Sequence, residues 1–225
     1  MVRNGWLQGD VPYWRGKYDQ AAAAMQRARD ANGVSLAQLP RRARSFVGHN
    51  LALAGDYSEA LEMLAEWLPN AAEIRFVPLY GVDPYQFLAW AYSQTGMPDM
   101  AREPLEIVEQ WFLQLDARVQ MMNSADLYAA ARNAALMDDR EMALDRLQQA
   151  VAAGWRGFYI NNHDPRWGPL RNDPRYQALM AEVKADVDRQ RAVVEEIDAE
   201  EDFQALLDKV RENRKSTAGE NPGER

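Results

Sequence analysis

Apolar and small residues recur at helical spacing in four similar stretches of the chain, residues 15–28, 54–67, 95–108 and 137–150. In each stretch an alanine follows a turn residue by five positions. An apolar residue comes four positions later, and a small or apolar residue three further on. Spacings of four and three place side chains on one face of a helix. The four sets are Gly16, Ala21, Met25 and Ala28; Gly55, Ala60, Leu64 and Trp67; Gly96, Ala101, Leu105 and Val108; and Asp138, Ala143, Leu147 and Ala150.

A second apolar pattern precedes three of these turns and also has helical spacing. One of its small residues, Gly48, would cost about 1 kcal/mol relative to alanine inside a helix, which predicts close helix packing at that position. The repeating unit is therefore a helix, a short turn and a second helix. The matching positions are Val47, Gly48 and Leu51; Leu88, Ala89 and Tyr92; and Ala130, Ala131 and Ala134.

This pattern predicts an all-α fold with essentially no sheet. The expected helices run near 17–31, 39–54, 57–68, 84–95, 98–115, 123–137 and 140–153.

The repeated unit resembles the tetratricopeptide repeat family. The Gly-x-Tyr-x-x-Ala turn of that family is present at residues 16–21 and 55–60, and the resemblance covers roughly residues 12–153. The four alanines are 39, 41 and 42 residues apart, longer than the usual period of about 34. The resemblance implies a right-handed α-α superhelix whose concave groove is lined by the first helix of each pair. Pro12 falls where the first of these helices should run, so we expect about four pairs in residues 1–153, the first incomplete and cut from a longer array.

Residues 154–213 are expected to form a capping segment with helices, and residues 214–225 a disordered tail. Two Asp-Pro pairs begin at Asp164 and Asp173, and an aspartate followed by proline is typical of a helix start. The first predicts a single turn, and the second a helix from about 174 to 197. A shorter helix is expected around Phe203 to Val210. The segment is similar to those that close tetratricopeptide regions in bacterial signalling proteins.

Residues His163, Asp164 and Asp173 are also of the types that bind zinc or iron, so a metal or acid–base site is the alternative interpretation of this segment. The chain has only one other histidine. Because helix-start chemistry explains the spacing of both aspartates, we predict neither a metal site nor catalytic residues.

The expected groove combines aromatic, basic and amide side chains, which suit an extended peptide. The alternative is that its aromatic residues belong to the core between repeats. The candidate binding residues are Arg42, Phe46, His49, Gln86, Trp90, Tyr128 and Arg132.

Composition narrows the classes of partner and compartment. A net charge of -8 argues against nucleic acid, which needs clustered cations. No stretch is long and apolar enough for a membrane helix or a secretory signal, so we expect a cytoplasmic protein without a membrane partner. The chain has no cysteine, which excludes disulfides and thiolate chemistry.

We therefore predict a non-catalytic interaction module without cofactors, which binds a protein or peptide in the groove or associates with itself. Two alternatives are a regulatory or sensory arm of a larger bacterial cyclase, kinase or transcription regulator, and a metal-dependent enzyme. No nucleotide-binding or hydrolase motif is present in the sequence.

Overall fold

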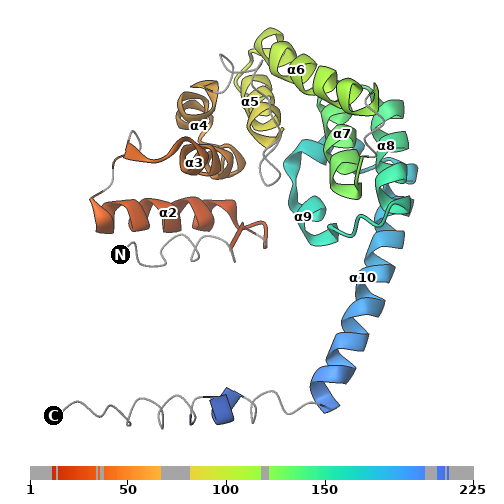
Figure 1. The fold of residues 1–225 in the computed structure, drawn as a ribbon. Coiled ribbons are helices and arrows are strands. Elements are labelled where there is room, and N and C mark those ends of the chain that lie inside the picture. The colour runs from red at the N-terminus through yellow and green to blue at the C-terminus, as the bar shows by residue number, and fades with distance from the viewer. Residues whose placement is uncertain are drawn as a thin grey trace, which may run out of the picture. The chain divides into compact units, whose positions relative to one another are not determined.

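The computed structural model describes residues 12–13, 15–33, 35, 38–66, 82–117, 122–200, 207–210 and 212 (Figure 1). Within these residues the regular structure is helical and no strand occurs, which confirms the all-α prediction. The expected disordered tail, residues 214–225, lies outside the described residues.

Each helix predicted between residues 17 and 197 begins within two residues of its predicted start, and residues 158–163 form a further short helix in the expected capping segment. The first Asp-Pro pair begins a short 3-10 helix, and the second begins the long helix α10. In chain order the elements are α2 (Tyr18–Asn32), α3 (Arg41–Ala54), α4 (Tyr57–Leu64), α5 (Asp83–Gln94), α6 (Pro98–Ala117), α7 (Ser124–Leu136), α8 (Arg140–Ala152), α9 (Phe158–His163), η3 (Pro165–Leu170) and α10 (Pro174–Glu200).

Neighbouring helices pack as pairs, α3 with α4, α5 with α6 and α7 with α8 (Figure 1). The first helices of successive pairs also pack on one another, α3 on α5 and α5 on α7. A Cβ atom on Gly48 would lie 2.9 Å from Leu64 Cγ and 3.1 Å from Met63 Cβ, so only glycine allows α4 to approach α3 this closely. The four repeated alanines are also buried, as expected for small residues at close helix contacts: Ala21, Ala60, Ala101 and Ala143.

The four predicted turn residues adopt the same left-handed conformation. Gly16, Gly55, Gly96 and Asp138 have φ angles of 69°, 95°, 76° and 62°. At each turn the next backbone N–H donates to a carbonyl five residues earlier, as Asp56 does to Leu51 at 2.9 Å. This Schellman-type hydrogen bond ends the first helix of a pair and needs a residue that tolerates positive φ. The alignment of turn residues made from the sequence therefore corresponds to one repeated backbone geometry.

Asp138 is the one non-glycine residue with positive φ among the described residues. A left-handed conformation costs an ordinary residue about 1 kcal/mol or more, and aspartate tolerates it only somewhat better. We expect Asp138→Gly to raise the free energy of unfolding by up to about 1 kcal/mol, measured by urea denaturation followed by circular dichroism. Gly55→Ala is the matched opposite change and should lower it by a similar amount. A loss of stability in Asp138→Gly would contradict this expectation.

Buried apolar side chains pack in clusters between the helices. One cluster joins α3, α4 and α5 and includes Leu64, Phe87 and Leu88. Another includes Tyr85 on α5, Val108 and Phe112 on α6 and Ala130 on α7.

The chain divides into two compact units, Met1–Val183 and Lys184–Arg225. The first contains the helix pairs, α9, η3 and the beginning of α10. The second contains the remainder of α10. Among the described helices, none combines the length and the apolar character needed to cross a membrane.

Candidate functional site

The candidate groove residues lie on α3, α5 and α7, the first helices of three successive pairs. The side chain of Arg42 is outside the described residues, and Phe46 is half-buried. The other five side chains are buried: His49, Gln86, Trp90, Tyr128 and Arg132. Binding of a partner by these residues therefore remains a prediction, because in this structure they contact the chain itself.

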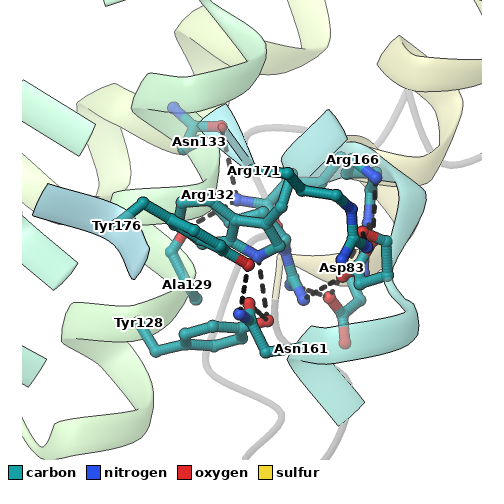
Figure 2. A network of polar contacts seen from close by, with 12 residues as sticks. Asp83, Tyr128, Ala129, Arg132, Asn133, Asn161, Arg166, Arg171 and Tyr176 are labelled. Atoms are coloured by element: carbon teal, nitrogen blue, oxygen red, sulfur yellow. Dashed lines mark hydrogen bonds and ion pairs between the residues drawn. The ribbon is translucent and has the colours of Figure 1, made fainter. Parts of the chain in front are cut away.

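The side chains from α7 are covered by the closing segment, which we define as residues 158–170 of α9 and η3. Tyr128 is central to this contact and stacks on Trp155, with ring centroids 4.3 Å apart. Its hydroxyl donates to Asn161 Oδ1 at 3.0 Å and accepts from Trp167 Nε1 at 3.1 Å. Asn161 Nδ2 in turn donates to the hydroxyl of Tyr176 on α10 at 2.6 Å (Figure 2). The closing segment is thus joined to α7 and α10 by a chain of buried hydrogen bonds.

Gln86 connects α5 to α7 through both ends of its amide. Its Nε2 donates to the carbonyl of Ala129 at 2.8 Å, and its Oε1 accepts from Arg132 Nε at 2.7 Å. Both Gln86 and Arg132 are buried. Their polar groups would be costly to bury without hydrogen-bond partners, and these hydrogen bonds supply the partners.

An ionic network of two arginines and two aspartates links α5, α7 and the closing segment. Figure 2 labels Asp83, Arg132 and Arg166 of this network. Arg166 donates twice to Asp164, from Nε at 2.9 Å and from Nη2 at 2.7 Å, while Arg132 pairs with Asp83. Two longer ion pairs of 3.7 Å cross between them, Arg132 to Asp164 and Arg166 to Asp83. The four charges cancel, which makes it possible to bury Arg132, Asp164 and Arg166.

Arg166 also lies over the ring of Phe87, with its guanidinium carbon 3.7 Å from the ring centroid. Its Nη1 makes no hydrogen bond within the described residues. The face of the Phe87 ring and the Asp83 carboxylate, 3.7 Å away, offset the cost of burying this group. A cation over an aromatic face is favourable when both groups are removed from water.

The pKa values of both aspartates follow from this network. Burial alone would raise the pKa of Asp164, but Arg166 and Arg132 outweigh it and hold the pKa below its usual value of 3.8. For Asp83, whose side chain is 37% exposed, the guanidiniums of Arg132 and Arg166 likewise outweigh burial and lower the pKa. Both carboxyl groups are therefore ionised at neutral pH, as the ion pairs require.

His49 lies inside the helix stack, against Phe87. The two rings are stacked with centroids 4.3 Å apart, and Ser45 Oγ is 3.1 Å from His49 Nε2. Burial lowers the pKa of His49 from 6.5 to about 3; Arg166 and Arg132 add to this effect, and Asp83 opposes it. The ring is consequently neutral at physiological pH. Ser45 is fully buried as well, so this serine–histidine pair is enclosed within the helix stack.

A neutral, buried His49 makes the stability of the protein depend on pH. The unfolded chain protonates this histidine below about 6.5 while the folded chain does not, so stability is complete above that pH and falls as the pH decreases. We expect a loss of roughly 1.4 kcal/mol per pH unit between about pH 6 and pH 4 from this group. In His49→Gln this slope should be smaller by that amount, measured by urea denaturation at several pH values. Equal slopes in the two proteins would contradict the prediction.

The segment considered as a metal or acid–base site has a structural explanation. Asp164 accepts from the backbone N–H of Arg166 at 3.0 Å, and Asp173 accepts from that of Arg175 at 2.7 Å, so both aspartates cap helices as predicted. His163 lies over Gly16, where a Cβ atom would be 2.5 Å from its Cγ. Among the described residues no group of three or more histidine and acidic side chains is arranged to hold a metal ion.

Asp83 and Arg166 take part in the network, but sequence reasoning did not single them out. Asp83 precedes Pro84, so local pattern would assign it a capping role, yet it is the first residue of α5 itself and its carboxylate pairs with Arg132. It turns instead toward Arg132, 49 residues away in the sequence. No short-range signal could have revealed this pairing.

A pocket of about 550 Å³ opens between α6 and α8, on residues outside the network. Exposed apolar side chains line it, including Leu113, which is 50% exposed, and Met142, which is 39% exposed. At one side Arg146 of α8 donates twice to Glu109 of α6, at 2.6 and 2.9 Å. The complete lining is Phe112, Leu113, Met122, Asp139, Met142, Asp145, Arg146 and Gln149.

No protein-family model and no curated protein matches the chain. The tetratricopeptide resemblance accordingly rests on the repeated residues alone.

Proposed function

We propose that the chain is a non-catalytic, cytoplasmic interaction module of tetratricopeptide type, a right-handed stack of helix pairs. It binds an amphipathic helical segment of a partner protein in the pocket between α6 and α8. The observation that carries the proposal is this open pocket, which combines exposed apolar side chains with charged residues, whereas five of the seven candidate residues on the first helices are buried.

The pocket has the chemistry that suits such a segment. Phe112 forms a buried apolar base, while Leu113 and Met142 expose flexible apolar surface beside it. Methionine and leucine side chains adapt to anchors of different shape, and an amphipathic helix buries its apolar face in grooves of this kind. An apolar surface of this kind is a common feature of protein-binding sites.

The charges around the pocket favour a basic partner. Asp139 contributes a negative charge, Asp145 forms an exposed ion pair with Arg175, and the positive charge of Arg146 is neutralised by Glu109. Lysine or arginine residues flanking the apolar face of the partner helix would complement the acidic residues and increase the rate of association.

The groove predicted from the sequence is the less accessible location. A peptide at Tyr128 and Arg132 would have to displace the closing segment, with its hydrogen bonds to Tyr128 and its ion pairs to Arg132. The free energy needed to break these hydrogen bonds and ion pairs would make the binding free energy less favourable.

Peptide display against the full chain tests the proposal. We expect enrichment of sequences with apolar residues at helical spacing and flanking lysine or arginine. Synthetic copies of these peptides should bind Leu113→Asp at least about tenfold more weakly than the parent, because the variant places a charge in the pocket.

Met100→Asp is the matched control, because Met100 is also on α6 and also 50% exposed but does not line the pocket. It should bind the peptides within about twofold of the parent. Selection of no common motif, or equal losses in the two variants, would contradict the proposal. Loss of binding on changing Phe46, without loss in Leu113→Asp, would instead locate the partner at the first-helix face.

A further inference from the structure

The second half of α10 carries a row of apolar side chains that has no counterpart within the described residues. Val193, Val194 and Ile197 are 55%, 54% and 48% exposed, although valine and isoleucine usually lie in protein interiors. Isolated helices are marginally stable in water, and β-branched residues lower helix propensity further. A helix of this composition needs another surface to pack on.

Val194 and Ile197 of this row fall on a coiled-coil repeat, and Val193 flanks it at a g position. Alternating steps of four and three along α10 define one seam, in which a positions and d positions face a partner helix. The a positions are Met180, Val187 and Val194, and the d positions are Tyr176, Val183, Gln190 and Ile197. The first part of this seam, at Tyr176, Met180 and Val183, is buried, whereas Gln190, Val194 and Ile197 are exposed.

We propose that residues 187–197 of α10 form a parallel two-stranded coiled coil with the same residues of a second copy of this chain. This self-association surface is independent of the pocket between α6 and α8. It forms a two-fold symmetric contact, in which each residue of the seam meets its own equivalent.

Charge complementarity selects a second copy in parallel orientation. In a parallel coiled coil a g residue lies beside the e residue of the next heptad on the other helix. Here Asp186 occupies g and Arg191 the following e, so the two helices would exchange two Asp–Arg pairs. In the single chain both residues already have partners, among them Arg189 and Gln190 for Asp186 and Glu195 for Arg191, and they would exchange these for the pairs between the two copies.

The residue types at the seam agree with this arrangement. β-Branched residues at a, here Val187 and Val194, favour two-stranded coiled coils, and the polar Gln190 at a single d position fixes the register at some cost in stability. The outward f positions are all alanine and leave that side of the helix without large apolar groups: Ala178, Ala185, Ala192 and Ala199.

Sedimentation of the full chain over a series of concentrations tests the association. We expect the average mass to rise from one chain towards two. Val194→Asp should weaken the association at least about tenfold, because a charge at an a position would be buried. Gln190→Leu should strengthen it, because leucine is favoured at d. Ala192→Glu, on the outer side of the same helix segment, should leave it within about twofold of the parent.

The absence of native cysteine allows the orientation to be tested by a single introduced thiol. Ile197→Cys should form an intermolecular disulfide under mild oxidation, because equivalent d positions are adjacent in a parallel pair. Ala192→Cys should not. A parent that stays monomeric at every concentration would overturn the proposal. So would a dimer unaffected by Val194→Asp, or one in which Ile197→Cys fails to cross-link.

Discussion

Replacing Asp164 with alanine is expected to lower the free energy of unfolding by about 3–5 kcal/mol, because the change leaves a buried positive charge without its partner. Arg166 would lose both of its hydrogen bonds to the Asp164 side chain, and Asp83 alone would face the two guanidiniums. The measurement is urea denaturation at neutral pH. Asp139→Ala is the matched control, because Asp139 caps α8 in the same way but is not part of this four-residue network, and should cost only about 1 kcal/mol.

A double-mutant cycle separates the network from the loss of a cap. Arg166→Met alone leaves an excess negative charge, whereas Asp164→Ala with Arg166→Met leaves the balanced pair of Arg132 and Asp83. The double variant should therefore be less destabilised than the sum of the single variants, by about 1–3 kcal/mol. Additive effects would show that the four charges do not act as a unit.

The second large effect is expected from Trp167→Ala, which should cost about 3–5 kcal/mol. Trp167 is completely buried, and its indole N–H donates to Tyr128, so the substitution leaves a cavity and an unpaired hydroxyl acceptor. In a domain of this size each kcal/mol lowers the melting temperature by roughly 2–4 °C, so a decrease of about 10 °C is expected by calorimetry.

Tyr159→Ala is the control for Trp167, because Tyr159 belongs to the same closing segment but is 47% exposed. Its cost should stay below about 1 kcal/mol. If Trp167→Ala were equally mild, the closing segment would not be an integral part of the folded unit. If it were severe, any partner that enters the first-helix face would have to displace a strongly held element.

The closing segment covers part of the surface that the sequence suggested as a binding site. The sequence suggested polar and aromatic side chains that suit a peptide, among them His49, Gln86, Tyr128 and Arg132. In the folded protein most of their polar groups form hydrogen bonds with other parts of the same chain. Tyr128 and Arg132 contact the closing segment, a short helical stretch near the end of the repeat region. This observation supports the location of the partner site at the exposed pocket.

The sequence by itself determined the helices, their turns and their closest contacts, because these depend on neighbouring residues. Alanine and leucine at steps of four and three define a helix face, and glycine at Gly16, Gly55 and Gly96 permits the left-handed turn. Gly48 indicated close packing, and the structure shows Leu64 against it. The Asp-Pro pairs likewise specified two helix starts, since capping is a local interaction.

Only the tertiary structure decided which polar groups meet. Asp83, Arg132, Asp164 and Arg166 lie on three separate parts of the chain, and nothing in their local sequence indicates that they pair. Burial of the groove residues and the opening of the pocket between α6 and α8 were also decided at this level. The physical reason is that helix formation is governed by contacts a few residues apart, whereas burial and ion pairing depend on which helices pack together.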